Sequence, residues 1–228
     1  MKSFFVTGTD TDVGKTVICA GLARAIANKG IDIGVMKPFA SAESEQSPFR
    51  SRDVEILADA AKVSDPDELI NPQFFSMPAS PYTASKTLKV NVDLDMVMKK
   101  FQELQKTHEM MLVEGIGGIM TPILKDYFVA DMIRDMRLDA IIIIKSKIGT
   151  INHTIMTSKM CKDHGVSVAG IIINDDSDGY NPDELRRDIT ELTGHKILGI
   201  IPKIKSLEIS DVSGVISQQI DIDELFRS

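Results

Sequence analysis

Cysteine is scarce in this 228-residue chain, which contains only Cys19 and Cys161. The two residues stand far apart, without the CxxC spacing of redox motifs or the spacing of metal sites, and two cysteines are too few for a disulfide scaffold. Each falls in a helical pattern, where a thiol behaves as a small apolar side chain. We therefore expect two buried thiols in preference to a redox role.

Long hydrophobic runs are also missing. The longest, residues 140–144, is far too short to cross a bilayer. The N-terminus enters a strand-like run at once and carries no basic region followed by a cleavable apolar segment. The sequence therefore predicts a soluble, cytoplasmic protein with no membrane partner.

Positive charge is in deficit, with 26 lysines and arginines against 33 acidic residues and a net charge of −7. No basic cluster interrupts this balance, so a nucleic-acid partner held by phosphate neutralisation is not expected. A content of 43% hydrophobic and 26% charged residues is typical of a globular protein. Because internal repeats, low-complexity tracts and linkers are missing, we predict one domain over residues 1–228.

Six apolar runs alternate with amphipathic segments along the chain. The runs are continuously apolar, which is typical of strands that are buried on both faces. In one intervening segment, the apolar residues between 94 and 104 form a single helical stripe. Alternation of this kind predicts an α/β fold in which helices cover both faces of a parallel sheet. The predicted strands are residues 3–7, 34–37, 110–114, 140–145, 168–174 and 197–201.

A glycine-bracketed loop, GTDTDVGKT at residues 8–16, follows the first of these runs and has the form of a phosphate-binding P-loop. Glycine allows successive backbone N–H groups to turn toward one anion. Lys15 would bring its charge to the β- and γ-phosphates, and the Thr16 hydroxyl would bind Mg²⁺. A helix opening near Gly14 would direct its positive end at the same phosphates. Although five residues separate Gly8 from Gly14 where the standard motif has four, the loop predicts a P-loop NTPase fold that binds a nucleoside triphosphate.

Polar side chains end several of the predicted strands: Lys37, Glu114, Lys145 and Asn174. Ligands of open parallel sheets bind beyond the carboxyl ends of the strands, so these residues are expected to meet over the P-loop. Lys37 is either a surface charge or a group that stabilises charge developing during phosphoryl transfer. Glu114 is our candidate for a Walker-B carboxylate on Mg²⁺, against the alternative of a solvated strand end.

Asp53 leaves two interpretations open, because it stands near the start of a predicted helix over residues 54–62. It is either a favourable charge at the helix N-terminus or a metal ligand. A further helix opens at residues 149–153 (GTINH), where Thr150 is a plausible N-cap and the helix end could hold a carboxylate. His153 has no catalytic partner nearby and is expected to be structural or exposed. The other three histidines show no constellation.

Two long loops separate these elements. Residues 38–52 are polar and without regular pattern, which is typical of a functional loop. Residues 71–86 contain Pro72, Pro78 and Pro81, which oppose helix formation through that stretch. The second loop is either a rigid connector or a wall of the substrate site.

Taken together, these motifs resemble those of the dethiobiotin synthetase family. Several motifs in register are far more specific than any one of them, and the extended P-loop is itself a trait of the family. The matching residues run from position 3 to about 203, in the family's order and approximate spacing. They are GTDTDVGKT (8–16), MKPFAS (36–41), Asp53, VEGIGG (113–118), GTINHT (149–154), IIIND (171–175) and IIPK (200–203).

The resemblance implies an ATP-dependent ligase of biotin synthesis that acts with Mg²⁺ as a homodimer. Its members convert 7,8-diaminopelargonate (7,8-diaminononanoate), CO₂ and ATP into dethiobiotin, ADP and phosphate. One amine takes up CO₂ as a carbamate, ATP phosphorylates the carbamate, and the other amine closes a cyclic urea. This chemistry needs positioning and charge stabilisation and no covalent nucleophile.

The resemblance also implies the roles of individual residues. Catalysis would fall to Thr11, Lys15 and Lys37, and Mg²⁺ to Thr16, Asp53 and Glu114. The substrate would contact Lys37, Ser41 and, across a dimer interface, Thr150, Ile151 and Asn152. Nucleotide and Mg²⁺ would be bound by Asp12, Val13, Gly14, Lys15, Thr16, Val17, Asp53, Glu114, Gly115, Ile116, Gly117, Asn174, Asp175, Pro202, Lys203 and Ile204.

Two positions depart from the family pattern, since Ile116 replaces a small alanine and Asp12 stands where glutamate is also common. The nearest alternative is a switch ATPase of the plasmid-partition and septum-site type. Those proteins carry a signature lysine five residues before the catalytic lysine, where this chain has Asp10. A glutamine-dependent amidase would need an additional glutaminase domain for which the chain has no room.

Overall fold

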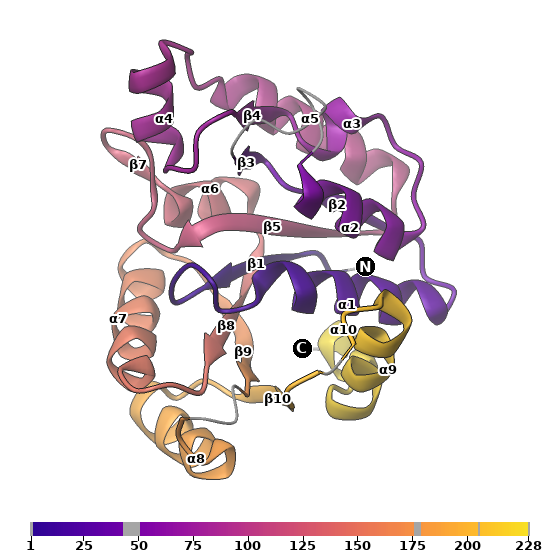
Figure 1. The fold of residues 1–228 in the computed structure, drawn as a ribbon, viewed down its shortest axis with the longest axis vertical. Helices are drawn as coiled ribbons and strands as arrows, with labels where there is room; N and C mark the ends of the chain where they lie inside the picture. The colour runs from indigo at the N-terminus through magenta and orange to yellow at the C-terminus, as the bar shows by residue number, and fades with distance from the viewer. Residues whose placement is uncertain (1, 43–50, 176–178, 205, 228) are drawn as a thin grey trace.

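A six-stranded parallel sheet forms the centre of the protein, with strand order β10-β9-β8-β1-β5-β2. The computed structural model describes residues 2–42, 51–175, 179–204 and 206–227 (Figure 1). The order confirms the predicted parallel sheet and all six predicted strands. They are β1 (Phe4–Gly8), β2 (Ile33–Met36), β5 (Met110–Gly118), β8 (Asp139–Lys145), β9 (Val168–Asn174) and β10 (Ile197–Ile201).

Helices cover both faces of the sheet, as predicted, because each strand buries apolar side chains on two sides. In β1, Phe4 and Val6 face one hydrophobic core, and Phe5 faces the other. The first core is closed by α1 (Lys15–Asn28), α2 (Arg52–Ala61), α9 (Ile209–Gln219) and α10 (Ile222–Arg227). The second is closed by α5 (Leu94–Thr107), α6 (Val129–Met136), α7 (Thr150–Asp163) and α8 (Pro182–Thr193).

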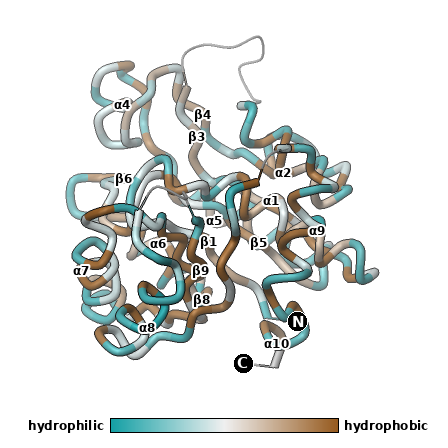
Figure 2. The backbone as a smooth tube through the Cα atoms, turned by 60° about the horizontal axis from the view of Figure 1, so that its bottom comes forward, coloured by the Kyte–Doolittle hydropathy of each residue, from teal (hydrophilic) through white to brown (hydrophobic). Residues whose placement is uncertain are grey.

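The burial of these elements follows their sequence patterns. Every side chain of residues 140–144 is fully buried, and Figure 2 shows the central strands β8 and β9 as strongly hydrophobic. The predicted apolar stripe of α5 is buried at Val97, Phe101 and Leu104. Cys19 and Cys161 are free and buried, as predicted, and burial raises the pKa of Cys161 to about 12. In the described ranges, no helix combines the length and apolarity that a membrane span requires.

Several short elements beyond the main sheet were not predicted. Residues 39–41 of the first long loop pair with a strand of the second loop, while residues 43–50 lie outside the described part of the chain. The second loop also contains helix, so the prediction that its prolines exclude helix is wrong. The elements are α3 (Asp67–Ile70), α4 (Pro81–Leu88), the parallel pair β3 (Phe39–Ser41) and β4 (Gln73–Phe75), and the antiparallel pair β6 (Pro122–Leu124) and β7 (Tyr127–Phe128).

Two helices begin differently from what the sequence predicted. Pro81 begins α4 because the first residue of a helix needs no N–H partner, and the Ser80 hydroxyl accepts a hydrogen bond from Thr83 N instead. The N-cap of α7 is Gly149, with φ of 91°, where Thr150 was expected. Thr150 is instead the first helical residue and makes no capping bond. The residue before it has a left-handed backbone conformation, which glycine adopts without strain.

Three histidines that the sequence left without partners have them in the structure. His108 lies between two carboxylates, with Nδ1 2.8 Å from Asp32 Oδ1 and Nε2 3.0 Å from Asp65 Oδ2. His164 contacts Asp131, and His195 contacts the Ser158 hydroxyl. Burial alone would lower the pKa of His108, but the hydrogen bonds and charges of Asp32 and Asp65 outweigh it and raise the pKa.

The contacts of His108 with Asp32 and Asp65 predict a pH-dependent contribution to the stability of the fold. Because the folded-state pKa lies above the unfolded value, the contribution is complete below about pH 6.5 and is lost as pH rises through the folded pKa. We expect His108→Gln to lower the free energy of unfolding by an amount on the order of 1 kcal/mol at pH 6 and by clearly less at pH 9. Urea unfolding at both pH values checks this, and an equal loss at the two would contradict it.

Candidate functional site

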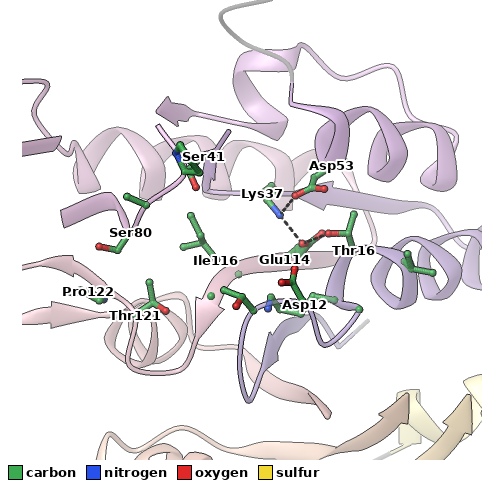
Figure 3. Close-up of a pocket in the computed structure, with 18 residues that line it drawn as sticks. Asp12, Thr16, Lys37, Ser41, Asp53, Ser80, Glu114, Ile116, Thr121 and Pro122 are labelled. Carbon is green, nitrogen blue, oxygen red and sulfur yellow. Dashed lines mark hydrogen bonds and ion pairs between the residues drawn. The ribbon is translucent and has the colours of Figure 1, made fainter. Parts of the chain in front are cut away.

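A cleft of about 840 Å³ lies beyond the carboxyl ends of β1, β2 and β5. Such a volume suits a small-molecule site. Figure 3 shows its polar side chains converging from both walls. The cleft is lined by Thr11, Asp12, Gly14, Lys15, Thr16, Val17, Lys37, Ser41, Asp53, Pro78, Ala79, Ser80, Glu114, Gly115, Ile116, Gly117, Thr121 and Pro122.

The P-loop forms the floor of this cleft and joins β1 to α1. Gly14, with φ of 92°, directly precedes the helix, and an added Cβ there would lie 2.4 Å from Asn174 Nδ2. Asn174 donates this amide to Val13 O at 3.0 Å, so the end of β9 braces the loop. The Val13 side chain points into the core, so only its backbone faces the site.

Lys15 extends along the inner side of the loop. Its Nζ donates a hydrogen bond to Asp10 O at 2.7 Å, and the side chain is largely buried. Burial lowers the pKa of Lys15, and Lys37 adds to this effect, although Glu114 and the loop aspartates counteract it. The ammonium group is therefore held in a poorly solvated position, where an anion is a strongly favourable partner.

Lys37 occupies the centre of the polar network (Figure 3). Its Nζ lies 2.6 Å from Glu114 Oε1 and 2.8 Å from Asp53 Oδ2, with the lysine side chain only 6% exposed. Thr16 donates its hydroxyl to Glu114 Oε1 at 2.8 Å. Burial alone would lower the pKa of Lys37, but Glu114 and Asp53 outweigh it and raise the pKa, so the lysine is charged.

Asp53 belongs to the first turn of α2 but does not cap it. The cap is Ser51, whose hydroxyl accepts a hydrogen bond from Val54 N. Asp53 instead directs its carboxylate at Lys37 and remains 44% exposed. Its charge still complements the positive end of the helix. Asp53 is therefore a favourable charge at the helix N-terminus, as one interpretation held, and its carboxylate also reaches the cleft.

Glu114 lies inside β5, not at a strand end, because the strand continues through Gly118 and pairs there with Gly8. The side chain is buried, at 1% exposure, and so is not the solvated residue of the alternative interpretation. One oxygen, Oε1, accepts from both Thr16 and Lys37. The other, Oε2, is buried and has no hydrogen-bond partner among the described residues.

The donor set around Glu114 fits Mg²⁺. An orphaned carboxylate oxygen, a threonine hydroxyl and the Asp53 carboxylate are all hard oxygen ligands. The described residues contain no cluster of three histidine, cysteine, aspartate or glutamate side chains that could hold a metal alone. A partial set of this kind suits Mg²⁺, which keeps several waters and takes substrate phosphate oxygens.

The far half of the cleft is less charged. Ile116 and Pro122 face Ser41 and Ser80 across it, and Thr121 closes one side by accepting a hydrogen bond from Gly118 N at 2.9 Å. Thr121 and Pro122 were not among the predicted site residues, because they belong to no recognisable motif. Residues 78–80, in the loop predicted as either a connector or a wall of the substrate site, lie in the wall of the cleft.

The other predicted site residues lie outside this cleft. Asn174 ends β9 beside the P-loop, and Asp175 accepts a hydrogen bond from Ser146 Oγ at 2.7 Å. Residues 202–204 follow the end of β10, with Pro202 and Lys203 exposed. Thr150, Ile151 and Asn152 form the first turn of α7, where Thr150 is buried and Asn152 exposed.

Comparison with known proteins gives a consistent picture. A family model described as "AAA domain" matches residues 2–210. The "ATP-dependent dethiobiotin synthetase BioD" of Nitrosopumilus maritimus (strain SCM1) is 53% identical, with all of both chains covered. The protein of the same name from Bacillus subtilis (strain 168) is 38% identical over all of this chain and 98% of its own.

Solved structures resemble the chain in fold alone. The MinC:MinD cell division protein complex of Aquifex aeolicus contains a chain with a TM-score of 0.58 and 18% identity, covering 100% of this chain and 95% of its own. A ParA family ATPase of Chlorobium tepidum TLS gives a TM-score of 0.55 and 17% identity, covering 96% and 93%. These likenesses confirm the predicted P-loop NTPase fold.

Because one oxygen of Glu114 is unpartnered, we predict that this residue makes the binding of ATP depend on Mg²⁺. Saturating ligand at a hundred times its Kd stabilises a protein by about 2.7 kcal/mol. In the unaltered protein, we expect ATP to raise the melting temperature more in the presence of Mg²⁺ than in the presence of EDTA. In Glu114→Gln, we expect ATP to raise the melting temperature by the same amount in both conditions. Glu103→Gln, at an exposed position of α5, is the control. A full Mg²⁺-dependent rise in Glu114→Gln would contradict the assignment.

Proposed function

This chain belongs to the family of ATP-dependent dethiobiotin synthetases, and we propose that its cleft transfers the γ-phosphate of ATP to a carbamate made from 7,8-diaminopelargonate. The protein is a ligase of biotin biosynthesis that forms dethiobiotin at the expense of ATP. The observation that carries the proposal is the buried ammonium group of Lys37, held between Glu114 and Asp53 beside the P-loop.

The reaction has three steps. An amine of the substrate attacks CO₂ and loses a proton, which gives an anionic carbamate. A carbamate oxygen then attacks the γ-phosphorus of ATP, and the bond to the ADP oxygen breaks. Finally, the second amine attacks the carbamate carbon and loses a proton, while phosphate departs with the transferred oxygen. The product is a cyclic urea, with ADP and phosphate released.

Two lysines counter the repulsion between carbamate and γ-phosphate. Lys15 lies beneath the phosphates on the P-loop floor, and Lys37 faces it from the end of β2. Thr11, exposed at the tip of the loop, adds a hydroxyl toward the carbamate. Fixed charges in a poorly solvated cleft stabilise developing charge without reorganisation. No side chain is required as a nucleophile, because the substrate supplies each attacking atom.

Mg²⁺ would be held by Thr16, Asp53 and Glu114 together with phosphate oxygens. When bound, the ion neutralises charge on the β- and γ-phosphates. The ammonium of Lys37 now contacts both carboxylates, so in the loaded enzyme we expect it to turn from them toward the γ-phosphate. Glu114 keeps the hydroxyl of Thr16 oriented for the same task.

The nucleotide lies along the P-loop and the neighbouring strand ends in this proposal. Asp12, Gly14, Val17 and the backbone of Val13 support the phosphates and ribose, and residues 115–117 border them from β5. The base reaches the edge formed by β9 and β10. The residues proposed there are Asn174, Asp175, Pro202, Lys203 and Ile204.

The diamine occupies the less charged half of the cleft, where Ser41 faces Ile116. We propose that its carboxylate is held by Thr150, Ile151 and Asn152 of a second protomer. Gly149 provides no side-chain cap for the first turn of α7, and the Thr150 hydroxyl is buried without a partner among the described residues. Beside it, Ile148 is 88% exposed and Met156 half exposed, which supports an apolar contact between protomers.

The cellular compartment is proposed to be the cytoplasm, where biosynthetic ATP is consumed and thiols such as Cys19 and Cys161 stay reduced. A switch ATPase of the partition type is disfavoured. The structural likeness to such proteins is one of fold, and Asp10 stands where they carry their signature lysine. Relatives at up to 53% identity carry the synthetase name.

Phosphate release from Mg-ATP and bicarbonate is expected to depend on the added diamine.

The Lys37→Gln variant should have a kcat about a hundred- to a thousandfold lower, because it loses a preorganised contact to the transition state, while its affinity for ATP is largely kept. Turnover measured by phosphate release and ATP binding measured by calorimetry check both parts. Diamine-independent hydrolysis stimulated by DNA or lipid would favour the switch ATPase, and unchanged turnover would remove Lys37 from the mechanism.

A site shared between protomers predicts complementation. Lys37→Gln and Asn152→Glu each damage the site, but a mixed dimer pairs an intact Lys37 with an intact α7 end in one of its two sites. After denaturation and refolding of an equal mixture, symmetric pairing predicts recovery of about a quarter of wild-type turnover. Recovery no greater than the sum of the separate variants would contradict a shared site.

A further inference from the structure

The backbone of Lys37 is held by residues that none of the motifs contains. Its N–H donates a hydrogen bond to Ile70 O at 2.7 Å. Its carbonyl oxygen accepts a hydrogen bond from Asn71 Nδ2, also at 2.7 Å. Both backbone polar groups of Lys37 are therefore bound by the segment at the end of α3, where Asn71 lies 34 residues further along the chain.

The sheet alone does not fix Lys37. β2 is an edge strand of the main sheet, and its pairing with β5 ends at Met36, opposite Val113. Lys37 is the next residue, and Pro38 after it turns the chain away from the strand direction. Lys37 thus lies just beyond the last ladder pair, where its backbone is hydrogen-bonded to the Ile70–Asn71 segment.

Asn71 suits this task through its chemistry and its burial. The side chain is 1% exposed, and its Nδ2 also donates to Gln73 O at 3.3 Å. The opposite amide orientation would turn Oδ1 against two carbonyl oxygens, so the donor must face Lys37. Its own N–H is bound to Asp67 O at 2.8 Å, which holds the residue at the end of α3.

The amide also has an unpaired group. Asn71 Oδ1 is buried and without a partner among the described residues, and buried polar atoms are normally paired. A side chain that served only to fill space here would be apolar. A polar side chain in this place, despite its unpaired oxygen, indicates that the Nδ2 donor of Asn71 is required for the hydrogen bond to Lys37.

We propose that Asn71 is a positioning residue for Lys37: its amide fixes the carbonyl of Lys37, and through it the direction in which the lysine side chain leaves the backbone. The inference rests on the proposed role of Lys37 in phosphoryl transfer. Because Lys37 Nζ must reach carboxylates at 2.6 and 2.8 Å and then the γ-phosphate, a small shift of its Cα changes every one of these contacts.

Gln73 provides a matched control. It is buried like Asn71, its Nε2 donates to Asn91 O at 2.6 Å, and its Oε1 accepts from Asp93 N at 3.1 Å. These bonds hold the chain before α5 and do not touch Lys37. Asn71→Ala and Gln73→Ala therefore each remove a buried amide with two hydrogen bonds, but only the first releases Lys37.

The experiment measures kcat, ATP affinity and melting temperature for both variants. We expect both to melt earlier, Asn71→Ala alone to lose between about ten- and a hundredfold in kcat, and neither to change ATP affinity. In the Lys37→Gln background, Asn71→Ala should cause no further fall in kcat, because the residue it positions is gone. If Asn71→Ala does not fold, Asn71→Ser takes its place with the same expectations.

The possible results are distinguishable. A kcat for Asn71→Ala equal to that of Gln73→Ala would overturn the inference and leave the function of Lys37 standing. A further loss of kcat in the Lys37→Gln background would also overturn it, since Asn71 would then act independently of Lys37. Wild-type turnover in Lys37→Gln itself would instead overturn the proposed function on which the inference rests.

Discussion

The ion pair between Lys37 and Glu114 is the interaction on which the rest of the site depends. Both side chains are almost completely buried, and their charged atoms lie 2.6 Å apart. Buried ion pairs are weak stabilisers, because desolvation offsets most of the attraction, yet removal of one partner costs about 3–5 kcal/mol. A hydrophobic pair would serve stability equally well. The charges are best explained by the chemistry that they prepare.

The sheet order explains how these two residues meet. β1 carries the P-loop, β5 lies beside it, and β2 lies beside β5. Met36 pairs with Val113, so the residues that follow them, Lys37 just past β2 and Glu114 within β5, extend together over the P-loop. Thr16 and Asp53 reach the same point from the first turns of α1 and α2. Parallel strands thus bring cation, carboxylates and phosphate loop to one edge.

The sequence predicts what is local and periodic. The six main strands were predicted from continuous apolar runs, and the P-loop from its glycines and Lys15. Long-range contacts were not predicted, because they depend on strand order and on side-chain direction. Asn71 meets Lys37 across 34 residues, and His108 joins Asp32 and Asp65 across 76 and 43. The start of α4 at Pro81 was missed because proline is unfavourable inside a helix but favourable at its first position.

The fate of one oxygen atom separates transfer to a carbamate from hydrolysis by water. Turnover is started with ATP, diamine and bicarbonate labelled with oxygen-18, and stopped before the label exchanges with solvent. If the cleft directs the γ-phosphate to a carbamate, each phosphate released carries an oxygen-18 atom, and mass spectrometry of phosphate detects it. Phosphate without the label, formed together with dethiobiotin, would contradict this route.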